Sequence, residues 1–457
     1  MIAAVAAGHA ATAAAGAEIL EAGGTAADAA VAATLASCVS ETLMTGLLGG
    51  GHAIVFDAAS GRVRNLDCFV SVPSGRGAPM EELRVPFGEE LIHYAIGASS
   101  CGVPGVAAGL DAVWREHGRL PWAQVVEPAL RLARDGVELS AAHAACLRML
   151  EPVMTMREGA RMYAPRGTLL DAGAPLHQPG LARALELLAD EGAASVYTGT
   201  IARLLLELVA ERDGTITAAD LAEYAAEWSP PEEASFAGRR ILTRAGLSGV
   251  PAAFDALRPG GGPEALLAAL DGTASADGHT TNVCAVDADR NACVFTTSLG
   301  LGSGDWIPEL DLHLNSMLGE ADLVHDALVA GERMESMMAP TLAFDGDRLE
   351  LAIGAAGGTR LRTALVGAAA AILDEGASPQ DAIDRPRFHP VGNVVHAEHG
   401  VDERFLATLE RRGREVRRWS SRHHYFGGVS AIGRRAAAAD PRRTGATRTP
   451  ERAASTP

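Results

Sequence analysis

The feature that most constrains this sequence is a pair of short strand-like runs separated by a turn, in the second half of the chain. From Thr281 to Val286 small apolar and polar residues mix, as in a strand with at least one buried face. Residues 287–291 are rich in turn formers, and strand character resumes at 292–297. The sequence therefore predicts a β-hairpin that begins at two adjacent threonines, Thr280 and Thr281.

The threonine pair alone is ordinary strand composition, because β-branched residues are common in strands. Its surroundings are less ordinary. Gly278-His279 precedes the pair, and a glycine-rich run from Gly300 to Gly304 follows the hairpin. Two interpretations stay open from these residues: threonines that only build the strand, or a hydroxyl group placed for chemistry.

A second hairpin is predicted at residues 342–344 and 349–353, followed by a glycine-rich turn and a helix over 360–374. A strand that ends in Gly357-Gly358 at a helix start directs backbone N–H groups at one point, which is the geometry for holding an oxyanion. A close-packed turn explains the same two glycines equally well.

Turn signals and apolar spacing predict the remaining elements. Helices are expected at 9–22, at 25–36, within 102–135, and near 140–150, 180–190, 200–211 and 217–224, with a strand at 53–56. The Gly/Pro/Ala-rich segment 231–277 has weak periodicity, so we expect a poorly packed connector. The tail 435–457 has no apolar pattern and is expected to be disordered.

Charge and composition exclude several classes of function. The formal net charge of −18 argues against nucleic acid or an anionic membrane as a partner. All 39 basic residues are arginine, which excludes Schiff-base chemistry, attachment of pyridoxal phosphate and the lysine of a phosphate-binding loop. We expect no cofactor and no metal ion.

The cysteines and the start of the chain bear on its compartment. The six cysteines include no CxxC pair and are typical of small buried residues in a reducing environment. No basic segment followed by a leucine-rich core is present, and no run of eighteen uncharged apolar residues occurs. We expect a soluble, cytoplasmic protein that acts on a small molecule.

A set of motifs resembles the γ-glutamyltransferase (γ-glutamyltranspeptidase) family in order and spacing. They are GAEILEAGGTAADAAVAA, LLGGGH, VPGVAAGL, EPALRLARDGVELS, GHTTNVCAVDADRNACVFTTSLGLGSG, LHLNSM, MAPTL, GAAGGTR and PRFH. The resemblance extends from residue 3 to about 434. It implies an α/β fold of the N-terminal-nucleophile (Ntn) hydrolase type, with two stacked sheets between helical layers (αββα).

The resemblance also implies that the precursor cuts itself between His279 and Thr280, leaving pieces of 279 and 178 residues. The large subunit, 1–279, would supply helical layers and outer strands, and the small subunit, 280–434, would begin with the catalytic threonine. The freed α-amino group, with a reference pKa of about 7.7–8.0, can accept the hydroxyl proton of Thr280. Gly357 and Gly358 align with the oxyanion site.

Near the nucleophile, the sequence departs from the family at two positions. Asn282 stands where relatives have histidine, two residues after the nucleophile. After the hairpin the family has Thr-x-Asn, which aligns with Ser298 and Gly300, so the hydroxyl is kept and the amide is lost.

The aligned acyl pocket is also altered. Phe69 stands where the family has an arginine that grips the γ-glutamyl α-carboxylate, and Arg76 is a displaced candidate to replace it. Of two serines that hold the same carboxylate, Ser336 remains and Met337 replaces the other. Glu320 aligns with the shorter acid that binds the α-amine.

These departures predict a self-processing threonine hydrolase with an altered acyl pocket. Each lost charge-assisted hydrogen bond is worth about 1.5–3 kcal/mol, which argues against glutathione as the main substrate. Some relatives in bacterial natural-product pathways resemble this pattern and hydrolyse a carbon–carbon bond beside a carbonyl. The alternatives are a γ-glutamyl transferase or hydrolase with a rebuilt clamp, and a binding homologue that is never processed.

Overall fold

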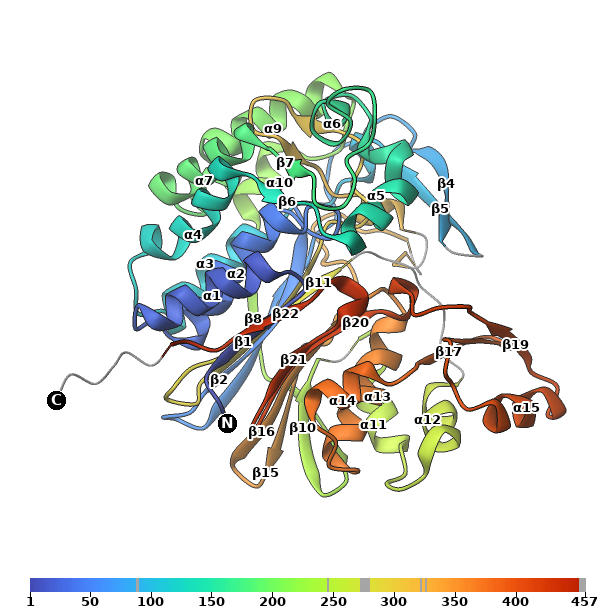
Figure 1. Ribbon diagram of the computed structural model, residues 1–457. Helices are drawn as coiled ribbons and strands as arrows, with labels where there is room; N and C mark the ends of the chain where they lie inside the picture. The colour runs from blue at the N-terminus through green and yellow to red at the C-terminus, as the bar shows by residue number, and fades with distance from the viewer. Residues whose placement is uncertain (88–89, 245, 272–279, 321–322, 325–326, 452–457) are drawn as a thin grey trace.

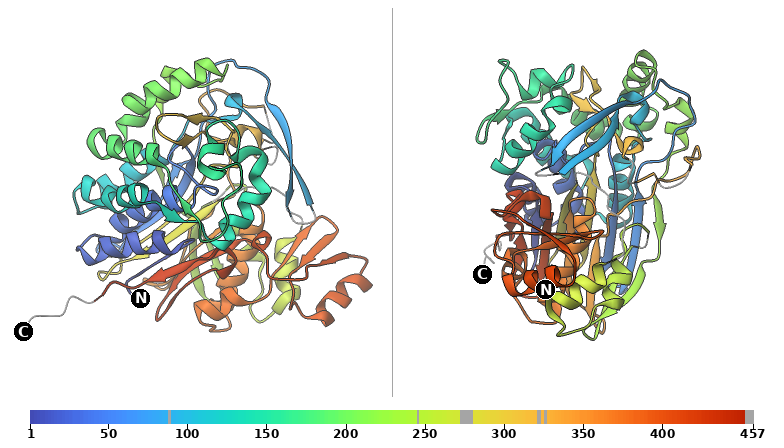
Figure 2. Two further views of the ribbon diagram at one scale, coloured as in Figure 1. Left: turned by 45° about the horizontal axis from the view of Figure 1, so that its top comes forward. Right: turned by 90° about the vertical axis from the view of Figure 1, so that its right-hand side faces the viewer.

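Two β-sheets lie face to face in the middle of the molecule, and helices cover both outer surfaces (Figures 1 and 2). The computed structural model describes residues 1–87, 90–244, 246–271, 280–320, 323–324 and 327–451. His279 and the predicted cleavage point lie outside the described residues. The predicted four-layer αββα architecture is confirmed.

The first sheet contains the predicted hairpin near its centre and is antiparallel throughout. Thr281 pairs with Thr297, and the two strands form the predicted hairpin. The strand order is β22 (Ala446–Arg448), β1 (Ala4–Ala7), β11 (Thr281–Val286), β12 (Ala292–Ser298), β2 (Gly50–Asp57), β3 (Arg62–Cys68) and β8 (Glu227–Ser229).

The second sheet is built around the second predicted hairpin, which is also confirmed. Its strand order is β21 (Ala437–Ala439), β20 (Gly428–Gly433), β16 (Arg348–Ala356), β15 (Thr341–Asp345), β10 (Arg239–Thr243) and β9 (Glu232–Phe236). Between the sheets lies an apolar core that includes Ile54, Val294, Leu342 and Ile432. Burial of this core fixes which face of each strand points inward.

Helices α1–α3 pack directly on the first sheet, with the other helices of that layer behind them. This layer consists of α1 (Ala10–Glu21), α2 (Ala26–Ser40), α3 (Val106–His117), α4 (Trp122–Asp135), α7 (Pro179–Glu191), α8 (Ala194–Tyr197), α9 (Thr200–Glu211) and α10 (Ala218–Glu223). The second sheet is covered by α11 (Val250–Ala256), α12 (Gly262–Leu270), α13 (Arg360–Leu373) and α14 (Pro379–Asp384).

Smaller elements lie around the ends of the sandwich (Figure 2). They are β4 (Glu81–Phe87), β5 (Glu90–Ile96), β6 (Val137–Glu138), α5 (Ala141–Met154), α6 (Gly159–Tyr163), β7 (Pro175–Leu176), β13 (Trp306–Ile307), β14 (Leu312–His313), β17 (Phe388–Val391), β18 (Val394–Ala397), α15 (Glu403–Arg411), β19 (Glu415–Arg418) and four short 3₁₀ turns, η1 (Ala98–Ser100), η2 (Met317–Gly319), η3 (His424–Phe426) and η4 (Pro441–Arg443).

Local signals placed the helix starts well. The Thr25 hydroxyl and the Asp28 carboxylate form a capping box at the start of α2, the helix predicted to begin at residue 25. This helix runs four residues beyond the expected end, to Ser40, and every residue in it is buried. The hydroxyls of Ser37 and Ser40 donate to carbonyls of the preceding turn, so these polar residues are accommodated within the buried helix.

The prediction of a poorly packed connector at 231–277 is wrong for the described residues up to 271. This segment supplies β9, β10, α11 and α12, and Phe236, Ile241 and Phe254 are buried in the core beneath the second sheet. Each element is too short to show a clear hydrophobic period, so its packing partners decide its conformation.

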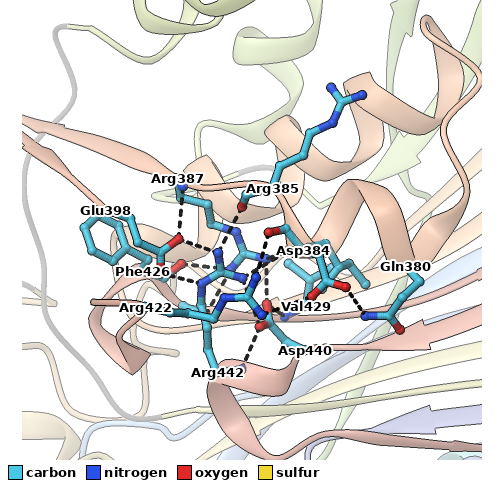
Figure 3. A network of polar contacts seen from close by, with 12 residues as sticks. Gln380, Asp384, Arg385, Arg387, Glu398, Arg422, Phe426, Val429, Asp440 and Arg442 are labelled. Carbon is cyan, nitrogen blue, oxygen red and sulfur yellow. Dashed lines mark hydrogen bonds and ion pairs between the residues drawn. The ribbon is translucent and has the colours of Figure 1, made fainter. Parts of the chain in front are cut away.

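The prediction of a disordered tail is wrong for residues 435–451. Strands β21 and β22 complete the edges of the two sheets, and the chain between them crosses from one sheet to the other. In this crossing Arg442 is fully buried and forms ion pairs with Glu398 and Asp440, while Arg387 also pairs with Asp440 at 2.5 Å (Figure 3). Backbone pairing and buried ion pairs hold this segment, and neither leaves an apolar pattern in the sequence.

Within the described residues, no single helix is long and apolar enough to cross a membrane. One helix pair, Pro179–Glu191 with Ala194–Glu211, meets the length and composition requirement only when combined, and it is bent by 111°. No group of three or more His, Cys, Asp or Glu side chains in the described part of the chain is arranged to hold a metal ion.

Candidate active site

Thr280 lies at one end of the sandwich, immediately before β11, and is buried. Strand β16 of the second sheet ends at the same place, because its final residue, Ala356, lines the same small cavity as Thr280. Glu41 and Arg443 line this cavity as well. The two predicted hairpins therefore bring Thr280 to the end of β16, which the Gly357-Gly358 turn directly follows.

The two threonines have different surroundings. The Thr281 hydroxyl donates to the Glu41 carboxylate at 2.5 Å, so Thr281 faces the helical layer. Asn282 faces the other sheet, where a Cβ on Gly354 would lie 3.3 Å from its side chain. Since side chains alternate along a strand, Thr280 continues the face of Asn282, between the sheets.

The Gly357-Gly358 turn has a backbone that requires glycine. Gly357 has φ +124° and Gly358 has φ +59°. A Cβ on Gly357 would lie 2.9 Å from the Cα atom of Gly427, so no side chain fits there. The carbonyls of these glycines accept hydrogen bonds from Arg360 and Leu361 at the start of α13. N–H groups at a helix N-terminus lack partners within the helix and can bind an anion.

Ser298, Gly300 and Glu320 lie together beside Thr280. Ser298 ends β12, one residue beyond the Thr281–Thr297 pair, so the register places it next to Thr280. Its hydroxyl accepts a hydrogen bond from the Gly300 N–H at 3.0 Å. A Cβ on Gly300 would be 2.5 Å from a Glu320 carboxylate oxygen. The acid and the glycine therefore adjoin.

Phe69, Ser336 and Met337 are the residues that the sequence analysis aligned with the acyl pocket. Phe69 is buried at the end of β3, with its ring stacked on His52 at 5.6 Å between centroids. The Ser336 hydroxyl accepts a hydrogen bond from the N–H of Met338. Met337 is half-buried and shares a second small cavity with Gly358.

Arg76 does not line either cavity. It is exposed, and its neighbours Gly75 and Ala78 are hydrogen-bonded to the backbone of residues 213–215. The cation beside Ser336 is instead Arg244, which donates to the Ser336 carbonyl at 2.9 Å and lies 3.7 Å from Asp67. Arg244 comes from the segment expected to be a connector, so sequence reasoning missed it.

Sequence analysis also did not identify Glu41 and His143, because neither residue belongs to a recognisable motif or spacing. Glu41 accepts hydrogen bonds from Thr281 and from Thr12 at 2.7 Å, and burial raises its pKa to about 7. Burial lowers the pKa of His143 to about 3, so this imidazole is neutral near pH 7. The wall of the Thr280 cavity that faces the helices is thus polar. Near pH 7 its Glu41 carboxyl group is only partly ionised and its His143 imidazole is neutral.

Comparison with known proteins shows the family to which this sequence belongs. The sequence matches the gamma-glutamyltranspeptidase family over residues 12–259 and 263–449. The chain belongs to this family.

Relatives in the gamma-glutamyltranspeptidase family differ in the names of their activities. The acylase ACY 1 proenzyme of Pseudomonas sp. is 29% identical over 93% of this chain and 88% of its own length. Glutathione hydrolase proenzyme 1 of Schizosaccharomyces pombe is 25% identical over 88% of this chain and 76% of its own. The crystal structure of cephalosporin acylase from Bacillus halodurans has a TM-score of 0.82, at 22% identity over 98% and 95% of the two chains, and so shares the fold.

The resemblance found in the sequence is therefore confirmed. The protein is an enzyme of the Ntn hydrolase and transferase class, a gamma-glutamyltransferase-like hydrolase by family. Its fold brings Thr280, Asn282, Ser298, Gly300, Glu320 and the Gly357-Gly358 turn to one end of the sandwich. Phe69 directly follows β3, and Ser336 and Met337 lie in the loop that precedes β15, whereas Arg76 lines neither cavity.

Proposed function

We propose that this protein is a self-processing threonine hydrolase whose substrate is a small molecule other than glutathione. Thr280 would cleave an amide bond, or a carbon–carbon bond next to a carbonyl, in the biosynthesis of a secondary metabolite. The observation that supports this proposal best is the position of buried Thr280 beside the end of β16, where the Gly357-Gly358 turn begins. Six free, buried cysteines favour the cytoplasm as its location.

Processing would use the same hydroxyl as catalysis. The Thr280 oxygen attacks the carbonyl of His279, the peptide nitrogen leaves, and the acyl group moves to the oxygen as an ester. Water then hydrolyses the ester and frees the α-amino group of Thr280. This amine has a reference pKa near neutrality and serves as the general base, so nucleophile and base are on one residue.

In the catalytic cycle, the amine takes the hydroxyl proton as the oxygen attacks the substrate carbonyl. The N–H groups of Gly357 and Gly358 stabilise the oxyanion. Its collapse expels the leaving group, which takes up the proton, and water hydrolyses the acyl-enzyme. A carbon leaving group follows the same path only if conjugation stabilises its carbanion.

Hydrolysis or transfer of γ-glutamyl groups remains the second candidate. It is favoured by Arg244, which lies beside Ser336 and 3.7 Å from Asp67, two residues before Phe69. Arg244 thus supplies a positive charge near the position where the family has an arginine and this chain has Phe69. Against it stand the apolar side chains of Phe69 and Met337, which cannot hydrogen-bond a carboxylate. An unprocessed binding homologue is a third possibility that the experiment below also tests.

Mass spectrometry of the intact protein tests the proposed function. We expect the purified protein to separate into pieces of 279 and 178 residues under denaturing conditions. After brief incubation with a panel of amides and 2-oxo acids, the smaller piece should gain the mass of an acyl group. A single full-length species that gains no mass from any compound would contradict the proposal and favour the binding homologue.

Met337 provides a test of the acyl pocket. We expect slow turnover of γ-glutamyl-p-nitroanilide, and Met337→Ser should raise kcat/KM by roughly tenfold or more, since it restores one hydrogen bond to a carboxylate. The matched control is Met149→Ser, a half-buried methionine on α5. Fast wild-type turnover at low substrate concentration would show that the pocket still accepts γ-glutamyl groups.

A further inference from the structure

Arg443 is a buried cation whose hydrogen-bond donors are almost unused. The residue is 7% exposed. A guanidinium group has five N–H donors, but the described residues accept one hydrogen bond from it, at the Met44 sulfur atom 3.2 Å from Nη1. Its Nε has no partner among them. A thioether is a weak acceptor, so a buried charge is left largely without compensation.

The nearest carboxylates are engaged elsewhere. Asp440 pairs with Arg387 and Arg442, and Glu41 accepts hydrogen bonds from Thr12 and Thr281. Neither forms an ion pair with Arg443 within the described part of the chain. Their charges act on Arg443 from a distance, and burial lowers the pKa of its guanidinium.

The neighbouring Arg442 shows what a structural arginine looks like in the same segment. It is fully buried, pairs with Glu398 and Asp440, and also donates to the carbonyls of Ile383 and Arg385 (Figure 3). The contacts of Arg442 therefore explain how the C-terminal segment is held in place. Arg443 has no such set of partners, so its charge needs another explanation.

Arg443 also lies next to the reacting groups. It lines the cavity that contains Thr280 and Ala356. A Cβ on Gly357 would lie 3.4 Å from its Nη2 atom, which places the guanidinium beside the oxyanion turn. An anion bound to Arg443 would thus touch a ligand held between Thr280 and Gly357.

The order of the strands shows on which side of the nucleophile this anion would lie. The acyl-pocket residues follow or precede β12, β3 and β15, which lie on one side of β11 and β16. Arg443 belongs to the crossing between β21 and β22, on the other side, beyond β1 and β20. An acyl group directed toward Glu320 and Met337 leaves the opposite side for the leaving group.

We infer that Arg443 binds a carboxylate on the leaving group of the substrate. The departing part of the molecule would be an amine or carbon acid that bears a carboxylate, as an amino acid does. This inference rests on the proposed function, because it takes the point between Thr280 and Gly357 as the site of reaction.

A pair of chromogenic substrates tests this inference. One acyl group, chosen from acetyl, butyryl, glutaryl and γ-glutamyl as the fastest for the wild-type enzyme, is attached to 4-nitroaniline and to 3-carboxy-4-nitroaniline. We expect the ratio of kcat/KM values to favour the carboxylated anilide, and Arg443→Gln to reduce this ratio by about tenfold or more. Arg443→Lys, which keeps the charge, should retain part of the preference. The matched control is Arg448→Gln, an exposed residue on β22.

Comparing ratios removes the effect of the carboxyl group on the reactivity of the aniline. An unchanged ratio in Arg443→Gln would overturn the inference. A binding measurement separates it from the proposed function: by calorimetry, free 5-amino-2-nitrobenzoate should bind the wild type about tenfold tighter than Arg443→Gln, while binding of 4-nitroaniline stays equal. If no anilide is hydrolysed but this difference is found, the proposed reaction fails and the carboxylate site stands. Equal affinity for the benzoate would refute the site.

Discussion

Thr280→Ala is expected to give a single full-length chain with activity reduced by about 10⁴-fold or more, the scale seen when a nucleophile is removed. Both effects have one cause, because the same hydroxyl would attack the His279 carbonyl and the substrate. The measurement is a denaturing gel of purified protein together with turnover of the best substrate found for the wild type.

Two further variants show which threonine acts. Thr280→Ser keeps a hydroxyl and should still be processed. Thr281→Ala should also be processed, because the Thr281 hydroxyl faces Glu41 on the helical side of β11. If Thr280→Ala still yields two pieces, or if only Thr281→Ala stays a single chain, Thr280 is not the nucleophile.

Gly358→Val is expected to lower kcat by about a hundredfold or more, the loss associated with one oxyanion donor. Gly358 has φ +59°, a conformation in which a β-branched side chain is strained, so the backbone N–H groups of the turn would shift out of line. Activity must be measured per processed molecule, since the processing intermediate carries the same negative charge and processing can slow as well.

Gly346→Val is the matched control for backbone strain. Gly346 lies in the turn between β15 and β16, at the other end of the same hairpin, with φ +57° and open space around its would-be Cβ. This variant should lose stability but keep its turnover per processed molecule. If Gly358→Val turns over as fast as the wild type, the oxyanion site lies elsewhere.

Much of the site could be predicted from local patterns in the sequence. Alternation, turn residues and glycine spacing located both hairpins and the Gly357-Gly358 turn, because a strand and its tight turn depend on a few adjacent residues. The capping box at Thr25 is local in the same way. Family motifs then indicated that Ser298, Gly300 and Glu320 belong to the same site as Thr280.

Other residues of the site lie in segments whose sequences look featureless. Arg244 follows a short strand in a Gly/Pro/Ala-rich region, and Glu41 ends a buried helix with no motif around it. Their positions depend on packing between elements far apart in the chain. No local pattern records such packing, which is why sequence analysis passed over both.

The sequence by itself determined the two hairpins, the threonine pair at the start of β11 and the family of the fold. Only the tertiary structure decided what the C-terminal segment does. Strand β22 pairs with β1, so the last strand of the chain lies beside the first, and the crossing before it carries Arg443 to the cavity of Thr280. The physical reason is that edge pairing uses backbone hydrogen bonds, which every residue except proline can donate, whereas the partner strand is fixed only when both sheets are assembled.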